Sequence, residues 1–201
     1  MRLHVWALIA AATALAGCSS THGATNQADV ASMHSSGLAT PGQVTSTTQA
    51  ANTSPRGMLV KKLGEPAGII ASTGAHPIVL TFTVDKIQVD PKCTGSTAEK
   101  PENGHFIAVS MTVKTTSDFA PDSFQSIDDT AFTIVGSDGI TDAGVSSYNA
   151  FECLKQSEQL PINYLPGSQY QGTVVLDSKY ASGVLVYPMR MSNAQGWEWS
   201  F

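Results

Sequence analysis

The sequence predicts an all-β sandwich that is preceded by a signal peptide and a disordered linker. Three observations lead to this fold class. The chain begins with an apolar run that ends in a cysteine, continues with a polar stretch free of aromatic residues, and closes with short segments of alternating apolar and polar residues. We therefore divide the 201 residues into 1–17, 18–57 and 58–201, of which only the last can bury a sizeable hydrophobic core.

The N-terminal part has the layout of a bacterial lipoprotein signal peptide. Arg2 gives a short positive region, and the apolar run of about 11 residues after it is too short for a membrane span of about 20 residues. The run ends in Leu15, Ala16, Gly17 and Cys18, the lipobox pattern that is cleaved between Gly17 and Cys18. We expect Cys18 to carry a diacylglyceryl thioether and acyl chains such as palmitate, which anchor the protein on the extracytoplasmic face of the cell membrane. An ordinary secretory signal is the alternative.

Residues 18–57 comprise the lipidated N-terminus and a segment with the composition of a flexible stalk. From residue 19 on, 29 of its 39 residues are Ser, Thr, Ala, Gly, Asn or Gln, and only Asp29 and Arg56 are charged. Such a segment buries too little apolar surface to offset an ordering entropy of about 1–2 kcal/mol per residue. We expect a spacer with a reach of about 30–40 Å. The alternative is a tail whose length has no functional importance. The sequence leaves open which of the two it is, and whether its Ser and Thr residues are O-glycosylated.

The charge balance excludes one class of partner. Loss of Arg2 with the signal peptide changes the net charge from −5 to −6, and the longest basic run is Lys61-Lys62. An acidic chain without a basic stripe argues against nucleic-acid binding and against a second, electrostatic attachment to anionic lipid.

The three cysteines are Cys18, Cys93 and Cys153. If lipid occupies Cys18, then Cys93 and Cys153 are the one remaining pair in an oxidising compartment, and we expect them to form a disulfide. A free or metal-binding pair is the alternative, although no further ligand lies at the spacing of a metal site.

Alternation with period 2 predicts the strands of the domain. The apolar phase slips by one residue after Val84, and a β-bulge near Asp85-Lys86 would return Ile87 and Val89 to the same face. The expected strands are residues 78–89, 106–113, 131–135, 170–177, 184–187 and 197–201, with turns at 136–139 and 166–167 and a helical turn near 149–154. Short strands between Gly, Pro and Asp clusters are typical of a sandwich with Greek-key-like connections.

Several short segments along residues 60–201 also occur in a recognisable order. They are Lys62-Leu63-Gly64-Glu65-Pro66, residues 79–84, residues 101–106 with the strand after them, Asp138-Gly139, Cys153, Pro166-Gly167, residues 170–172, residues 175–177 and residues 196–201. In these segments the chain resembles an immunoglobulin-like domain of unknown function found in lipoproteins of actinobacteria and other Gram-positive bacteria. That family is related in fold to the secreted mycobacterial immunoprotective antigen. The resemblance implies an immunoglobulin-like sandwich and brings no catalytic residues with it.

Few residues of the domain are suited to catalysis. Only His76 and His105 could act as a base, and each stands at the entry of a strand. The sequence contains neither G-x-S-x-G nor H-E-x-x-H. We therefore expect no enzymatic activity and no cofactor.

Four aspartates between residues 118 and 130 raise the question of a metal site. They are Asp118, Asp122, Asp128 and Asp129. The segment lacks the D-x-[DN]-x-[DN]-G spacing of a calcium loop, and Phe119, Phe124 and Ile127 interrupt it. We interpret it as a solvated acidic loop without metal, with calcium binding as the alternative.

Two groups of aromatic residues are candidates for binding. The first shares one face of the last strand, opposite Glu198 and Ser200, and comprises Trp197, Trp199 and Phe201. We expect this group to fill the core, since an exposed face would instead stack on glycans or a partner. The second group lies near predicted loops at the Cys153 end and forms a candidate binding surface: Tyr148, Phe151, Tyr164 and Tyr170.

These features favour a non-enzymatic envelope lipoprotein whose domain binds a protein or glycan of the cell envelope. The alternative is a small-ligand carrier or sensor, which would need a cavity of several hundred Å³ in the sandwich. A lipid-anchored hydrolase is the third hypothesis, and it would need a contact between a serine and a histidine.

Overall fold

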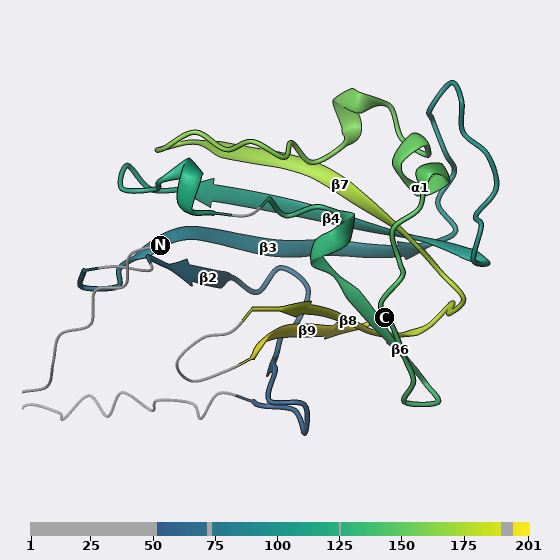
Figure 1. Cartoon of the computed structure of the whole chain (residues 1–201), viewed down its shortest axis with the longest axis horizontal. Coiled ribbons are helices and arrows are strands. Elements are labelled where there is room, and N and C mark those ends of the chain that lie inside the picture. Colours follow the sequence, from purple (N-terminus) through teal and green to yellow (C-terminus); the bar gives the residue numbers. More distant parts are fainter. Residues whose placement is uncertain (1–51, 72–73, 125, 190–194) are drawn as a thin grey trace, which may run out of the picture. The chain divides into compact units, whose positions relative to one another are not determined.

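The structure, a computed structural model, describes residues 52–71, 74–124, 126–189 and 195–201. Within these ranges two β-sheets pack face to face with a short α-helix outside them, so the predicted immunoglobulin-like β-sandwich is confirmed (Figure 1). The signal peptide, Cys18 and the linker up to residue 51 lie outside the described residues and stay predictions.

The two sheets differ in their strands and connections. Sheet A has the order β1 (Leu59–Val60), β9 (Gly196–Ser200), β8 (Gly183–Pro188), β5 (Thr133–Gly136) and β6 (Thr141–Asp142). Sheet B has the order β2 (Ala67–Ile70), β3 (Ile78–Val89), β4 (His105–Thr115) and β7 (Gln169–Ser178). Neighbouring strands are antiparallel except β1 and β9, which are parallel. The chain leaves sheet B after β4 and returns for β7, which makes β7 an outer strand.

Strand β3 contains the β-bulge that the sequence predicts. Its register against β4 shifts between Val84 and Lys86. Phe82 and Val84 are buried before the shift, and Ile87 and Val89 pack against the same core after it. The extra residue therefore keeps the apolar side chains of this long strand on the face toward sheet A.

The last strand, β9, supplies the centre of the core. Trp197 is 2% exposed, and its ring lies 5.1 Å from the ring of Phe82 and 5.6 Å from that of Tyr187. Trp199 is buried too, and Phe201 packs against the core while partly buried. The prediction that these residues belong to the core is confirmed. Such aromatic pairs add about 0.5–1.5 kcal/mol each beyond the burial of their area.

Residues 52–57, which the sequence assigns to the stalk, pack against β9. Arg56 Nε and Nη2 donate to Glu198 Oε2 and Oε1 at 3.0 and 3.1 Å, and Ser54 Oγ donates to Glu198 Oε2 at 3.1 Å. Glu198 is buried although it lies on the face of β9 opposite the two tryptophans. The ordered domain therefore already includes residue 52, because this charge-assisted contact holds a segment that has almost no apolar surface to bury.

Helix α1 (Tyr148–Glu152) lies on the outer face of sheet B (Figure 1). Ser147 Oγ accepts from Ala150 N at 3.1 Å and so caps the start of the helix. Ala150 and Cys153 pack on outward side chains of β4 and β7. The predicted Cys93–Cys153 disulfide is present and ties the end of the helix to the loop after β3. The helix is thus held at both ends.

Candidate functional site

The predicted aromatic surface is only partly formed, and its exposed members lie on α1. Tyr148 and Phe151 are 70% and 59% exposed. Tyr164 is 3% exposed, with its ring 5.0 Å from that of Tyr170, so its assignment to the surface is wrong. Tyr170 is partly buried, and its hydroxyl accepts from Leu165 N at 2.7 Å. The loop before β7 folds back over the open end of the core, and the spacing of residues along the sequence does not reveal that.

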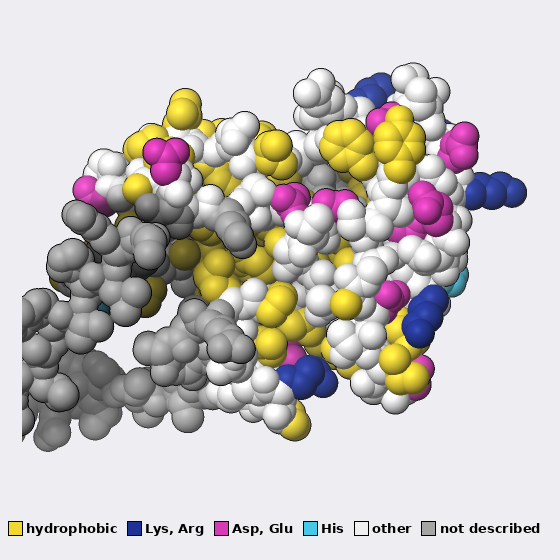
Figure 2. Space-filling view, in the orientation of Figure 1, with side chains coloured by type: hydrophobic (Ala, Val, Ile, Leu, Met, Phe, Trp, Pro, Cys, Tyr) yellow, Lys and Arg dark blue, Asp and Glu magenta, His cyan; other side chains and the backbone are white. Residues whose placement is uncertain are grey.

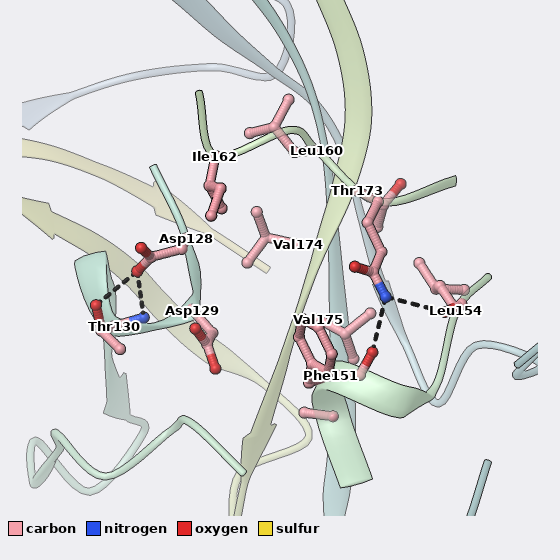
Figure 3. Close-up of a pocket in the computed structure, with 12 residues that line it drawn as sticks. Asp128, Asp129, Thr130, Phe151, Leu154, Leu160, Ile162, Thr173, Val174 and Val175 are labelled. Atoms are coloured by element: carbon pink, nitrogen blue, oxygen red, sulfur yellow. Dashed lines mark hydrogen bonds between the residues drawn. The ribbon is translucent and has the colours of Figure 1, made fainter. Parts of the chain in front are cut away.

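A pocket of about 200 Å³ opens beside Phe151 at the outer edge of β7, and we call it the β7-edge pocket. Its lining comes from the turn at η2 (Asp129–Ala131), from α1, from the segment after α1 and from β7. The residues that define its two walls include Asp128, Asp129, Phe151, Leu160, Ile162 and Val175. In Figure 3 the two aspartates lie on the opposite side of β7 from Phe151 and Leu154, and the Asp128 carboxylate is turned toward Thr130. The pocket is therefore apolar on one wall and acidic on the other.

The apolar wall is held in place by polar contacts. Leu160 N donates to Thr173 O of β7 at 3.1 Å. The Gln159 side-chain amide donates to two carbonyl oxygens at the end of α1, at 2.9 and 3.0 Å. Gly172 permits this approach, because a Cβ atom there would lie only 2.5 Å from main-chain atoms of residues 159 and 160. Together with the disulfide, these contacts fix the wall before any ligand arrives.

The opposite wall carries the carboxylates of Asp128 and Asp129. Burial alone would raise the pKa of Asp128, but hydrogen bonds from Ser126, Thr130 and the main chain outweigh burial and hold that pKa below its usual value. Asp129 accepts from Ser146 Oγ. In the part of the chain that the structure describes, neither carboxylate forms an ion pair. Asp128 therefore keeps an uncompensated negative charge at neutral pH.

The structure does not bring the four aspartates of this region together. Only Asp128 and Asp129 line the pocket, whereas Asp118 and Asp122 are exposed and are not part of its lining. Among the described residues no group of three or more Asp, Glu, His or Cys side chains could hold a metal ion. The geometry thus gives the calcium alternative no support.

The two histidines of the domain are not part of the pocket lining either. His76 Nδ1 lies 3.0 Å from Ala71 O, and His105 Nδ1 hydrogen-bonds with Asp90 Oδ2 at 2.9 Å. Neither ring hydrogen-bonds to a serine or a cysteine within the described ranges. The contact that a hydrolase would need to activate its nucleophile is therefore not formed there.

A second hollow, of about 580 Å³, also borders α1. Its lining is more polar and includes Thr94, Glu152 and Lys155. Phe151, Leu154 and Gln159 line both the hollow and the β7-edge pocket. Figure 2 shows hydrophobic side chains gathered near this end of the domain, with acidic side chains beside them. Of the three shared residues Phe151 is the aromatic one, and it is 59% exposed.

The sequence prediction missed the apolar wall formed by Leu160 and Ile162. Ile162 is 60% exposed although it borders the pocket. These two aliphatic residues flank Pro161 in a loop and follow neither strand nor helix periodicity. The hydrophobic pattern therefore does not distinguish them from any other loop residues. The only available signal is their position between a helix and a strand.

The chain matches no protein-family model and no curated protein. Among solved structures it is similar to MPT63, a secreted protein from Mycobacterium tuberculosis. The two share 17% identity over 72% of this chain and 98% of that one, with a TM-score of 0.45. Membership of the resembled lipoprotein family therefore stays a prediction. In the described ranges no helix is long and apolar enough to cross a membrane.

Proposed function

We propose that this protein is a non-enzymatic, extracytoplasmic binding protein that holds a partner protein of the cell envelope at the surface formed by α1 and the β7-edge pocket. The observation that carries the proposal is the exposure of Phe151 and Ile162 in the lining of the β7-edge pocket, with Tyr148 exposed on the same helix and the disulfide at its end. Exposed apolar patches on small domains with a packed core of their own mark interaction sites more often than accidents of folding.

The arrangement has the composition expected of an interface. Aromatic side chains that anchor in or beside a pocket dominate the energy of many protein complexes, and polar groups surround them. Here Phe151 lines the pocket, and Tyr148 is exposed on the same helix. The polar surroundings are Asp128, Asp129 and Glu152. The disulfide and the Gln159 amide keep these side chains from reorganising on binding, which lowers the entropic cost of association.

The dimensions of the β7-edge pocket favour a protein partner over a small ligand. Small-molecule sites are usually about 300–1,000 Å³ and mostly apolar, and the β7-edge pocket is about 200 Å³. That volume suits a single side chain. The neighbouring hollow of about 580 Å³ falls within that range, but its lining is more polar. The space between the sheets is occupied by rings such as those of Trp197, Phe82 and Tyr187, so it is not the place for a carrier's ligand.

A lipid anchor at Cys18 and a flexible stalk would make this binding efficient. Tethering keeps the domain at a high effective concentration near other membrane components, and a stalk with a reach of about 30–40 Å lets it search them. Substitution of Cys18 by Ala should accordingly release the protein from the membrane fraction.

The proposal is tested by site-specific photocrosslinking in cells. A photoreactive amino acid replaces Tyr148, and the captured proteins are identified by mass spectrometry with Phe151 intact or changed to Ser. We expect one envelope protein to be captured with Phe151 intact and to be lost in Phe151→Ser. The secreted Cys18→Ala form should capture less of it.

The matched control is Ile140, an exposed aliphatic residue in the turn between β5 and β6. A photoreactive residue there, and the variant Ile140→Ser, should leave capture through α1 unchanged. Equal capture from both positions, or capture that survives Phe151→Ser, would contradict the proposed surface.

A further inference from the structure

The outer edge of β7 is covered at two positions by other parts of the chain. In an antiparallel ladder, alternate residues direct their main-chain N–H and C=O groups to opposite sides of the strand. Leu160 N donates to Thr173 O at 3.1 Å, and Asp177 N donates to Val145 O at 2.8 Å. Because these partners lie outside sheet B, Thr173, Val175 and Asp177 all direct their main-chain groups away from β4.

Val175 lies between the two covered positions. Its own N–H and C=O groups point to the outer edge by the same alternation, and within the described ranges no residue hydrogen-bonds to either group. Thr173 and Asp177 are about 13 Å apart along the strand, at about 3.3 Å per residue. The gap therefore admits one residue of an incoming chain but not a full additional strand.

The β7-edge pocket provides a matching environment for the side chain of such a residue. Val175 lines the pocket, as do Phe151 and Ile162 on the apolar wall and Asp128 and Asp129 on the other (Figure 3). A volume of about 200 Å³ accommodates one aliphatic side chain. The carboxylates have no cationic partner in the described structure, so a cation on the incoming chain would complement them.

We propose that the β7-edge pocket binds one aliphatic residue of a partner polypeptide that has a Lys or Arg next to it. The main chain of the aliphatic residue bridges to the N–H and C=O of Val175, and its side chain fills the pocket. The neighbouring cation faces Asp128 and Asp129. This inference rests on the proposed function and specifies the chemistry of the partner segment.

Short peptides test the inference directly. The probe is acetyl-Lys-Leu-Lys-amide, titrated into ¹⁵N-labelled chain from residue 18 onward that carries Cys18→Ala. We expect shifts of the main-chain amide signals of Val175, Thr130 and Phe151. We also expect binding at least about tenfold tighter than that of acetyl-Glu-Leu-Glu-amide, which places like charges together.

Two further peptides separate the main-chain contact from the apolar one. Acetyl-Lys-Ser-Lys-amide lacks the aliphatic side chain. The peptide with N-methyl-leucine in the centre keeps that side chain but lacks the N–H that would donate to Val175 O. Both should bind about tenfold more weakly than the parent probe. Binding of the parent probe no tighter than the acidic peptide, or an unshifted Val175 amide at saturation, would overturn the inference.

Variants of the protein supply a matched control. Asp129→Asn should weaken binding of the basic probe several-fold, whereas Asp122→Asn removes the same charge from an exposed position outside the pocket and should not. Equal weakening by both variants would mean a general charge effect and would overturn the role of the pocket.

A second copy of this chain is the competing occupant, because the turn at Lys62-Leu63 is itself basic, aliphatic and exposed. Sedimentation of the same protein should show a monomer. A dimer abolished by Leu63→Ser would overturn the assignment to a partner. If the peptides fail while Phe151-dependent capture in cells persists, the inference on Val175 falls and the proposed function stands.

Discussion

The inner face of sheet B and its outer edge are completed in different ways. On the inner face, Phe82 packs against Trp197 and Tyr187 so closely that these rings are almost inaccessible. At the outer edge of β7, Leu160 and Val145 hydrogen-bond to the strand, and the main-chain groups of Val175 between them have no hydrogen-bond partner among the described residues, while Phe151 stays exposed. The comparison teaches that burial of aromatic rings stabilises this domain in one place, whereas incomplete coverage of the strand leaves a pocket in the other.

The largest loss of stability is expected from a substitution in β9, at the centre of the core. Trp197→Ala removes a ring that is buried between Phe82 and Tyr187 and leaves a cavity. We expect a loss of about 3–5 kcal/mol in the free energy of unfolding, enough to unfold a marginal domain. Urea titration followed by tryptophan fluorescence of Trp199 measures it. A loss below about 1 kcal/mol would contradict the central place of this ring.

The second-largest loss of stability is expected from removal of the Cys93–Cys153 disulfide. Cys93→Ala and Cys153→Ala each open a loop with a sequence separation of 60 residues. Each should lower the free energy of unfolding by about 2–4 kcal/mol, and the double variant should lose no more than either single one. Urea titration of the three variants measures these losses. Losses that add in the double variant would mean that the two residues act independently.

The contact that attaches the N-terminal segment should give an intermediate effect. Arg56→Ala leaves the buried Glu198 carboxylate with only Ser54 as a side-chain donor. Because Arg56 is itself partly exposed, we expect a loss of about 1–3 kcal/mol, which Arg56→Ala combined with Glu198→Gln should partly restore. Thermal unfolding of the parent protein and both variants measures this. No recovery in the double variant would contradict a penalty from the unpaired charge.

The smallest effect on stability is expected at the surface of α1. Phe151→Ser should change the free energy of unfolding by less than about 0.5 kcal/mol, because its ring is already 59% exposed. The same variant should abolish capture of the partner in cells. A loss of stability as large as that of Trp197→Ala would show that Phe151 serves the fold instead of binding.

Much of the fold could be predicted because alternation of apolar residues is a local property. The phase slip after Val84 predicts the bulge, and the buried face of β9 follows from Trp197 and Trp199. The disulfide follows from counting cysteines. Alternation gives the wrong answer for Glu198. An acidic residue opposite two tryptophans indicates a solvated face, but a segment far away in the sequence, which contains Arg56, covers Glu198.

The candidate site was predictable only in part, because segments distant in the sequence meet there too. Phe151 and Tyr148 were predicted to be near Cys153 and exposed, which the structure confirms, whereas Tyr164 is buried beneath the loop that contains it. Nothing in the sequence indicates that residues 159 and 160 pair with β7 or that Gly172 makes room for them. Contacts between non-neighbouring segments depend on how the loops pack, and loop packing has no periodic signature.

The sequence by itself predicted six of the nine strands that the structure describes, together with the bulge and the disulfide, and it predicts the lipobox at Cys18. Each of these depends on residue types at short or fixed spacings. The sequence did not predict the short strands β1, β2 and β6. Only the tertiary structure decided that Arg56 belongs to the domain, that Tyr164 is buried, and that the main-chain groups of Val175 have no hydrogen-bond partner among the described residues. The physical reason is that side-chain periodicity specifies which face of a strand is buried, whereas coverage of an edge or a charge requires segments distant in the sequence to meet.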